Sequence, residues 1–207
     1  PTVFIIDDEQ RVRHSLRRLF KLAGLNSKSY SSAQAFLVDY NPDSPGCLLL
    51  DVKMPGMDGL ELQKVLIARG NQTPIIFLSG AADVPITVEA FKSGAIDLIE
   101  KPFQEDLLLQ RVKDAMELDL RMRYKRLQRT LIEQRTALLT PRERDVMKWL
   151  LEGKSNKMIA TILGISSRTV EVHRKRVMNK MQADSIADLV QLTITTEGIN
   201  SDFSGEA

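Results

Sequence analysis

The chain has 207 residues, of which 43% are apolar and 27% are charged, a composition typical of a globular protein with one or two domains. No apolar run approaches the roughly 18 residues that a membrane span needs, and the acidic first residues do not resemble a signal peptide. The only cysteine, Cys47, has no partner for an internal disulfide. We therefore expect a protein of a reducing cytoplasm that makes no membrane contact.

The formal net charge of +2 is distributed unevenly along the chain. Residues 1–117 carry 13 basic and 16 acidic side chains, whereas residues 118–139 carry 6 and 2 and residues 140–185 carry 10 and 5. Residues 186–207 carry four acids and no lysine or arginine. An acidic first half before a basic second half indicates a regulatory domain followed by a domain that contacts nucleic acid.

Short apolar runs alternate with helical patterns over residues 1–117. The predicted strands are Thr2–Ile6, Ser27–Tyr30, Cys47–Leu50, Pro74–Leu78 and Ile96–Ile99. Amphipathic stretches of helical length lie between them, such as Val12–Leu22, which Gly24 is expected to end. This alternation predicts an α/β domain with a five-stranded, doubly wound parallel sheet that helices cover on both faces.

Residues 118–138 predict a linker helix without proline or glycine. Apolar residues recur at heptad spacing at Leu120, Tyr124, Leu127, Leu131 and Leu138, with Gln134 at the position in between. Two interpretations remain open. The helix either rests on the domains of its own chain or pairs with its copy in a dimer.

The pattern from Leu139 onward is entirely helical. Thr140, Pro141 and Glu143 form the sequence of a capping box with proline at the first helical position. Further helices are predicted at Asn156–Leu163, Ser167–Met181 and Ser185–Thr195. We therefore expect an all-α, four-helix domain over residues 139–195 and a flexible acidic tail over residues 196–207.

Polar side chains stand at the ends of the predicted strands. Asp7 and Asp8 follow the first strand, Asp51 and Ser79 follow the third and fourth, and Lys101 follows the fifth. Parallel strands bring these ends together, and three carboxylates in one pocket need a cation, for which Mg²⁺ is suited. The pocket predicts Asp51 as a nucleophile that forms an aspartyl phosphate, with Ser79 and Lys101 on the phosphoryl oxygens.

These residues belong to four longer motifs, which are Ile6-Asp7-Asp8-Glu9, the nine residues from Asp51 to Gly59, Leu78-Ser79-Gly80 and Lys101-Pro102-Phe103. With them, residues 1–117 resemble a response-regulator receiver domain, which has a flavodoxin-like fold. The resemblance implies that a sensor histidine kinase phosphorylates Asp51. It implies that Asp8, Asp51 and the main-chain carbonyl of Lys53 bind Mg²⁺, with Asp7 acting mainly through water, and that Ser79 and Lys101 carry the switch. Leu98 departs from the pattern, because many receivers have an aromatic residue there.

The segment from Ser155 to Thr169 predicts a helix, a tight turn at Gly164 and a second helix capped by Ser166 or Ser167. At 100° per residue, Val170, Val177 and Met181 share one face of the second helix. The opposite face carries Arg168, Glu171, Val172, Lys175, Arg176 and Asn179. Cations, an amide and a small apolar group suit contact with a DNA major groove, although a solvated helix face is the alternative.

Residues 139–195 resemble a LuxR-type helix-turn-helix domain through Leu139-Thr140-Pro141-Arg142-Glu143-Arg144, Ser155-Asn156-Lys157 and Thr169-Val170-Glu171-Val172-His173. The resemblance implies base contacts by Glu171, Val172 and Lys175. It implies phosphate contacts by Asn156, Lys157, Thr169, Arg174 and Arg176. His173 is interpreted as a packing or phosphate-bonding residue. Together the two resemblances match the order of the FixJ-like response regulators of bacteria.

The expected function is a switch rather than an enzyme activity. Phosphorylation of Asp51 is expected to remodel the surface at Val84–Ser93 and Ile96–Ile99, form a homodimer, and place two recognition helices on operator DNA, with RNA polymerase as a further partner. A phosphohydrolase of the haloacid-dehalogenase type needs a second Asp where this chain has Lys53. A second alternative is a receiver that only relays phosphate or binds proteins. The basic helix-turn-helix argues against it, because such a protein needs no DNA-binding domain.

Overall fold

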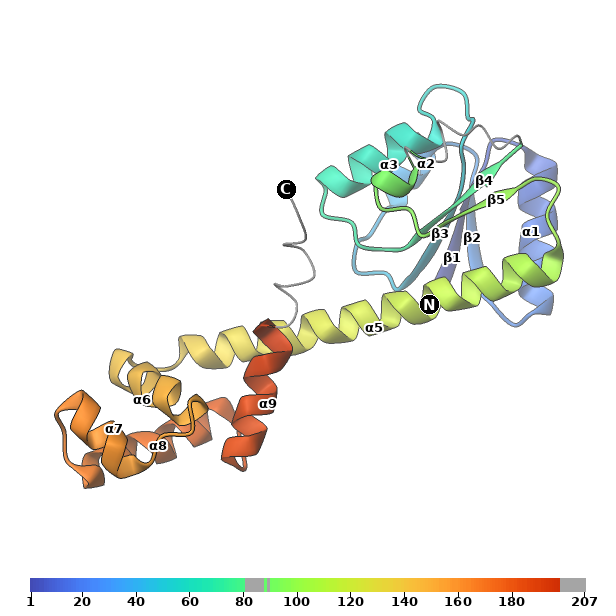
Figure 1. Cartoon of the computed structure of the whole chain (residues 1–207). Helices are drawn as coiled ribbons and strands as arrows, with labels where there is room; N and C mark the ends of the chain where they lie inside the picture. Colours follow the sequence, from blue (N-terminus) through green and yellow to red (C-terminus); the bar gives the residue numbers. More distant parts are fainter. Residues whose placement is uncertain (81–87, 89, 198–207) are drawn as a thin grey trace. The chain divides into compact units, whose positions relative to one another are not determined.

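The structure is a computed structural model that describes residues 1–80, 88 and 90–197 (Figure 1). The chain divides into two compact units, Pro1–Arg123 and Tyr124–Ala207, which we describe separately. Among the described helices, none combines the length and apolar character that a membrane span requires. The predicted tail lies outside the described residues from position 198 onward.

The first unit contains a five-stranded sheet in the order β2-β1-β3-β4-β5, with every pairing parallel. Its strands are β1 (Thr2–Ile6), β2 (Asn26–Tyr30), β3 (Gly46–Asp51), β4 (Ile75–Ser79) and β5 (Asp97–Glu100). The predicted sheet is therefore confirmed, with small differences at the strand ends. Because β3 is buried along its whole length, its sequence is a continuous apolar run up to Asp51.

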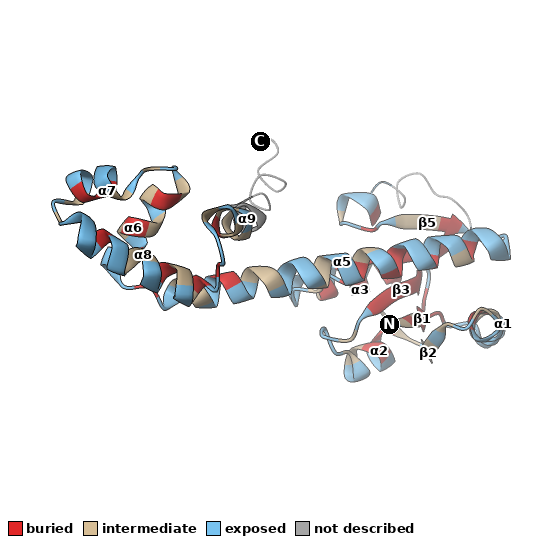
Figure 2. Cartoon of the chain, turned by 90° about the horizontal axis from the view of Figure 1, so that it is seen from below, coloured by how far each residue is buried: buried red, intermediate tan, exposed pale blue. Residues whose placement is uncertain are grey.

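Helices cover both faces of this sheet (Figure 1). They are α1 (Gln10–Leu22), α2 (Ala33–Asp39), α3 (Gly59–Ala68) and the first part of α5 (Glu105–Ala137). On one face, α1 and α5 pack against Cys47 and Leu49 of β3, and on the other, α2 and α3 pack against Leu48 and Leu50. Figure 2 shows buried residues along these strands. The predicted helix Val84–Ser93 lies partly outside the described residues, which include Val88 and resume at Ala90.

The predicted linker is the second part of α5, a continuous helix that begins at Glu105 and ends at Ala137. No proline or glycine interrupts this stretch, so nothing in the sequence ends the helix between the receiver-like residues and the linker. The residue limits that we predicted for the domains and the linker remain predictions.

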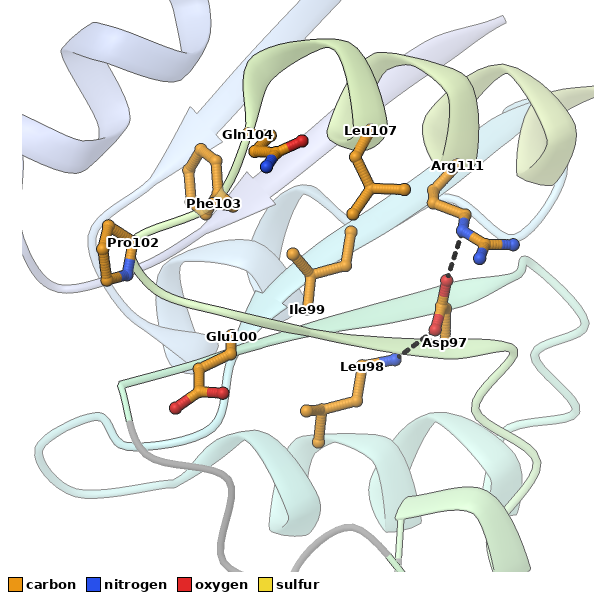
Figure 3. Close-up of a pocket in the computed structure, with 9 residues that line it drawn as sticks. All are labelled: Asp97, Leu98, Ile99, Glu100, Pro102, Phe103, Gln104, Leu107 and Arg111. Carbon is orange, nitrogen blue, oxygen red and sulfur yellow. Dashed lines mark hydrogen bonds and ion pairs between the residues drawn. The ribbon is translucent and has the colours of Figure 1, made fainter.

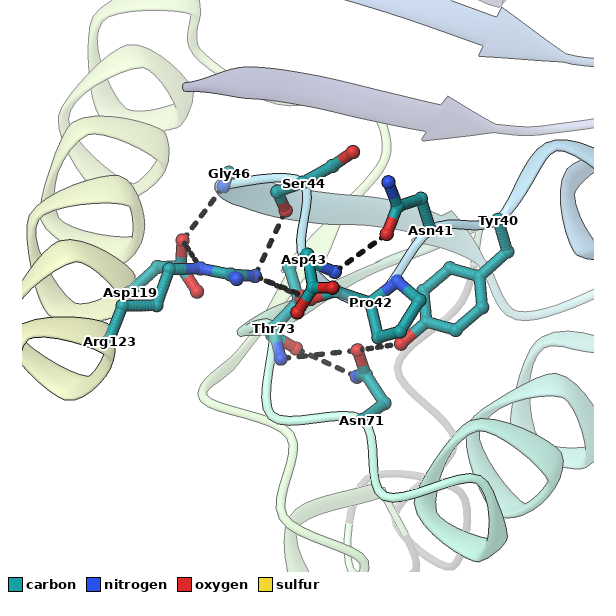
Figure 4. A network of polar contacts seen from close by, with 10 residues as sticks. All are labelled: Tyr40, Asn41, Pro42, Asp43, Ser44, Gly46, Asn71, Thr73, Asp119 and Arg123. Atoms are coloured by element: carbon teal, nitrogen blue, oxygen red, sulfur yellow. Dashed lines mark hydrogen bonds and ion pairs between the residues drawn. The ribbon is translucent and has the colours of Figure 1, made fainter. Parts of the chain in front are cut away.

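A buried ion pair fixes α5 to the first unit (Figure 4). Asp119 is 1% exposed, and its Oδ2 accepts hydrogen bonds from Gly46 N and from Arg123 Nε, both at 2.8 Å. Arg123 Nη2 donates to the carbonyls of Pro42 and Ser44 at 3.0 and 2.9 Å and to Thr73 Oγ1 at 3.3 Å. We call Asp119, Arg123 and these acceptors the α5 clasp. It joins the helix to the loops that precede β3 and β4.

The second unit contains α6 (Pro141–Leu151), α7 (Asn156–Leu163), α8 (Ser167–Met181) and α9 (Ile186–Glu197). The predicted capping box at Thr140 and Glu143 and the predicted cap at Ser166 are both present. Gly164 ends α7 with a φ of 65°, a left-handed conformation that favours glycine. Val170, Val177 and Met181 are buried, as the helical periodicity predicted. The four predicted helices are therefore confirmed.

Candidate functional site

Three carboxylates meet at one edge of the sheet in the first unit. Asp7 and Asp8 directly follow β1, and Asp51 is the last residue of β3, which is paired with β1. Asp7 and Asp51 are buried, Asp8 is exposed, and their carboxylate oxygens lie within 4.8 Å of one another. Oxygen ligands at this spacing suit a hard cation such as Mg²⁺. The parallel sheet thus brings the predicted acidic residues together.

Lys101 closes the same pocket from the end of β5. Its Nζ lies 2.8 Å from Asp7 Oδ2 and 3.3 Å from Asp51 Oδ1. Its main-chain N–H donates to the carbonyl of Ser79 at 2.7 Å, and Ser79 is buried at the end of β4. The predicted phosphoacceptor and hydroxyl therefore end the neighbouring strands β3 and β4, and the predicted lysine directly follows β5. Lys53 is exposed just beyond β3, and the predicted role of its carbonyl remains a prediction.

Burial raises the pKa of Asp51 to about 6, because desolvation disfavours its charged form. The positive charge of Lys101 lowers the pKa of Asp51, whereas the negative charge of Asp7 raises it. Desolvation would lower the pKa of Lys101, but hydrogen bonding to Asp7 and the charge of Asp51 raise it overall. The pocket therefore holds more negative charge than one ammonium group offsets, which favours a bound cation.

The sequence did not reveal the groups that hold the acidic residues in place. Arg13 Nη1 donates to the carbonyls of Asp7 and Asp8 at 2.7 and 2.8 Å, and Glu9 N donates to Asp7 Oδ1 at 2.8 Å. Gly59 begins α3 so close to the chain that a Cβ there would lie 2.3 Å from the carbonyl oxygen of Asp51. Any larger residue at this position would displace the strand end that carries Asp51.

In the absence of divalent cations, Asp51→Asn should stabilise the first unit by about 2 kcal/mol at pH 7.5. The pKa of Asp51 in the folded protein, about 6, lies above the ordinary value of 3.8, so the wild type loses stability as pH rises through this window. The asparagine carries no charge and avoids that loss. Hydrogen exchange of β3 amides, measured in EDTA, gives the free energy of opening.

The difference in stability between wild type and Asp51→Asn should shrink as pH falls from about 6 towards 4, because Asp51 becomes protonated in that range. Asp43→Asn, at an exposed loop position, is the matched control and should change the free energy by less than about 0.5 kcal/mol. A destabilised Asp51→Asn variant at pH 7.5 would show that the carboxylate is not under electrostatic strain.

A groove of about 330 Å³ lies between β5 and the beginning of α5, and none of the acidic-pocket residues lines it (Figure 3). Asp97 and Arg111 form an ion pair of 3.1 Å at one end of it. Leu98 and Ile99 point to opposite sides of β5. Leu98 packs against the core that includes α2 and α3, whereas Ile99 packs with α5. Several large apolar side chains around β5 are exposed, namely Val88, Phe91, Ile96 and Leu107.

In the second unit, the helix α8 presents the predicted DNA-contacting face. Six of the predicted residues on α8 are exposed, namely Arg168, Thr169, Glu171, Lys175, Arg176 and Asn179, as is Lys157 on α7. Val172 is 46% exposed on this face, although it is apolar. Within the described part of the chain, Arg168, Lys175 and Arg176 have no acidic side chain within ion-pair distance. These cations are therefore available to a polyanion.

Two predicted phosphate contacts lie together. Arg174 Nη1 donates to Asn156 Oδ1 at 3.2 Å, which links α8 to the beginning of α7. The hydroxyls of Thr169 and Ser166 lie 2.8 Å apart at the beginning of α8. His173 is half-buried, and among the described residues its Nδ1 has no hydrogen-bond partner. The far end of α8 is fixed by Arg135, which donates to the carbonyl of Met181 at 3.1 Å.

Comparison with protein-family models finds two matches that follow the two units. Residues 3–113 match the response regulator receiver domain, and residues 137–193 match the bacterial regulatory proteins of the luxR family. The chain belongs to the FixJ-like response regulators. It is 42% identical to the transcriptional regulatory protein FixJ of Bradyrhizobium diazoefficiens, covering 96% of this chain and 97% of that protein. It is also 42% identical to the response regulator protein TodT of Pseudomonas putida, covering 92% and 84%.

Solved structures agree with this assignment. The response regulator StyR aligns with a TM-score of 0.85 at 41% identity, covering 93% of this chain and 98% of StyR. Full-length FixJ from B. japonicum aligns with a TM-score of 0.60 at 42% identity, covering 95% and 97%. This response regulator thus combines a receiver domain with a LuxR-type DNA-binding domain, which implies regulation of transcription.

Proposed function

We propose that a sensor histidine kinase phosphorylates this response regulator on Asp51, and that the phosphorylated protein dimerises and binds operator DNA to activate transcription. The observation that carries the proposal is the pocket in which Asp7, Asp8 and Lys101 surround Asp51. The exposed basic face of α8 in the same chain would bind the operator DNA. RNA polymerase is the further partner that activation requires.

In the proposed reaction, a carboxylate oxygen of Asp51 attacks the phosphorus of a phosphohistidine. The new P–O bond replaces the P–N bond, and the imidazole leaves with the electron pair of that bond. Asp8, Asp51 and the carbonyl of Lys53 would hold Mg²⁺, with Asp7 bonded through water, and the cation would screen the negative charges that meet. Lys101, already 3.3 Å from Asp51, would pair with the phosphoryl oxygens.

The hydroxyl of Ser79 would donate a hydrogen bond to the phosphoryl group. This hydrogen bond would draw the end of β4 toward Asp51. Between β4 and β5 in the chain, the described residues include the exposed apolar side chains Phe91 and Ile96. Exposed apolar groups of this kind favour association, so the proposed dimer surface lies beside β5. Leu98 has no phenol to expose, so the switch would act through Ser79 and Lys101.

Incubation with acetyl phosphate and Mg²⁺ tests the phosphorylation step by intact mass. The wild type and the control Asp43→Asn should each gain one phosphoryl group, whereas Asp51→Asn should gain none. Asp8→Ala, which removes a proposed metal ligand, should slow the reaction at limiting Mg²⁺. Phosphorylation of Asp51→Asn, or an unchanged rate in Asp8→Ala, would refute the corresponding assignment.

Two substitutions on α8 should separate base contacts from phosphate contacts. Lys175→Ala removes a proposed base contact, so it should cost about 1–3 kcal/mol of binding and relax the preference at one base position. Arg176→Ala removes a proposed phosphate contact, so it should weaken binding to all sequences about equally and reduce the salt slope by about one.

The measurement is binding to operator and scrambled duplexes over a range of salt concentrations. Arg142→Ala is the control, because this arginine lies on α6, pairs with Asp145 at 3.7 Å and is not among the proposed DNA contacts. If Arg176→Ala changed the base preference and Lys175→Ala changed only the salt slope, the proposed orientation of α8 in the groove would be reversed.

A further inference from the structure

Five large apolar side chains form an exposed stripe on the second part of α5. We call them the seam. Their exposed fractions are Leu120 48%, Tyr124 64%, Leu127 64%, Leu131 43% and Leu138 65%. None of them belongs to a hydrophobic cluster of the described residues. A contiguous apolar stripe on a helix marks an interaction surface rather than a solvated face.

Each unit holds α5 by residues outside the seam. In the first unit the α5 clasp uses Asp119 and Arg123. In the second unit Ile132 is buried in a core with Met181, and Arg135 donates to the carbonyl of Met181. None of the five seam residues makes these contacts, although Arg123 and Arg135 flank the seam, so the seam itself is left for a partner.

The heptad pattern identifies that partner as a second copy of the same helix. Tyr124, Leu131 and Leu138 occupy one set of core positions, and Leu120, Leu127 and Gln134 occupy the other. Such a stripe is complementary to itself, because each core residue fits between residues of an identical helix. Gln134 meets its own counterpart only when the two helices are in register, and a polar core residue of this kind specifies register at some cost in stability.

The charges beside the seam select the parallel orientation. One flank carries Arg121, Gln128 and Arg135, and the other carries Arg123 and Thr130. In a parallel, in-register pair, position 123 lies opposite Gln128 of the second copy and Thr130 lies opposite position 135, so no like charges meet. Arg123 and Arg135 can then keep the hydrogen bonds that they make within their own chain. In the antiparallel alignment that keeps the same core layers, Arg121 faces Arg135 of the second copy and repels it.

We infer that two copies of α5 pair through the seam as a short, parallel, in-register coiled coil in the active dimer. This inference rests on the proposed phosphorylation-dependent dimer and specifies how its linkers meet. Fewer than three heptads are too short to associate stably alone. The two seams therefore pair only when the receivers have already dimerised and hold them at a high effective concentration. Without phosphorylation the receivers do not pair, and the protein stays monomeric.

Cysteine cross-linking tests the seam directly in the full chain. After phosphorylation with acetyl phosphate and Mg²⁺, Leu127→Cys should form about tenfold more disulfide-linked dimer under mild oxidation than before phosphorylation. Arg129→Cys is the matched control, because position 129 lies opposite the seam, and it should not link. The native Cys47 is buried and should stay unlinked in both variants.

Mixing Leu127→Cys chains with Leu131→Cys chains tests the orientation. A parallel pair links each variant to its own copy, whereas an antiparallel pair links position 127 to position 131 and would overturn the parallel arrangement. As a second measurement that does not need a disulfide, Leu127→Asp should weaken dimerisation in sedimentation and Arg129→Asp should not.

Three outcomes separate this inference from the proposed function. A phosphorylated dimer in which Leu127→Cys links and Leu127→Asp dissociates supports both. A phosphorylated dimer that neither variant affects more than its control overturns the seam and leaves the phosphorylation switch intact. A phosphorylated protein that stays monomeric in sedimentation overturns the dimer and the seam together.

Discussion

Replacing Arg123 with methionine should destabilise the receiver domain by about 3–5 kcal/mol, the range expected when one partner of a buried ion pair is removed. Asp119 is 1% exposed, and without Arg123 its carboxylate would retain only the hydrogen bond from Gly46. The carbonyls of Pro42 and Ser44 and the hydroxyl of Thr73 would lose their shared donor at the same time.

Hydrogen exchange of β3 and β4 amides in the full chain measures this loss. Arg121→Met is the matched control, because Arg121 pairs with Glu117 on the same helix at an exposed position 3.6 Å away. It should cost less than about 1 kcal/mol. Adding Asp119→Asn to Arg123→Met should restore part of the stability, since it removes the unpaired buried charge. Equal losses for Arg123→Met and Arg121→Met would contradict the buried character of the clasp.

Replacing Glu143 with glutamine should destabilise the DNA-binding domain by about 2–3 kcal/mol at pH 7. Glu143 is 2% exposed, and its Oε2 accepts from Lys180 Nζ at 2.6 Å and from Thr140 N at 2.9 Å. The hydrogen bond from Lys180, followed by that from Thr140, lowers the pKa of Glu143 from 4.5 to about 2. Glu143 thereby joins the beginning of α6 to the end of α8.

The pH dependence of this effect has a defined sign. A carboxyl group with a lowered folded pKa contributes stability above its unfolded pKa and loses it as pH falls. The difference between wild type and Glu143→Gln should therefore be full above pH 5 and shrink between about pH 4.5 and 2. Urea unfolding, followed by the fluorescence of Trp149, measures the stability of this domain, because Trp149 on α6 is the only tryptophan. Glu133→Gln, at an exposed pair with Arg129, is the control. A constant difference across this pH range would contradict the assigned ion pair.

The fold was predictable wherever periodicity or capping chemistry determines local structure. The apolar run Cys47–Leu50 predicted a strand buried on both faces, and the alternation of β3 residues between two cores agrees with that prediction. Gly164 and Ser166 predicted the turn and cap of the helix-turn-helix. The acidic pocket was predictable because parallel strands place Asp7, Asp51 and Lys101 at the same edge of the sheet.

The missed features depend on main-chain acceptors, which leave no pattern in the sequence. Arg123 donates to the carbonyl of Ser44, 79 positions earlier, and any residue type supplies such a carbonyl. Arg13 holds the carbonyls of Asp7 and Asp8 in the same way. The full extent of α5 was also missed, because the resemblance to a receiver domain ends at residue 117 whereas the helix continues without a break.

We propose that phosphorylation of Asp51 controls DNA binding by this response regulator. The most direct test of this proposal is the affinity of wild type and Asp51→Asn for a duplex selected from random sequence by the phosphorylated protein, measured with and without acetyl phosphate at fixed salt. Wild-type binding should tighten by about a hundredfold as two recognition helices act together, and Asp51→Asn should not respond. An equal response in both proteins, or none in a fully phosphorylated wild type, would contradict this account.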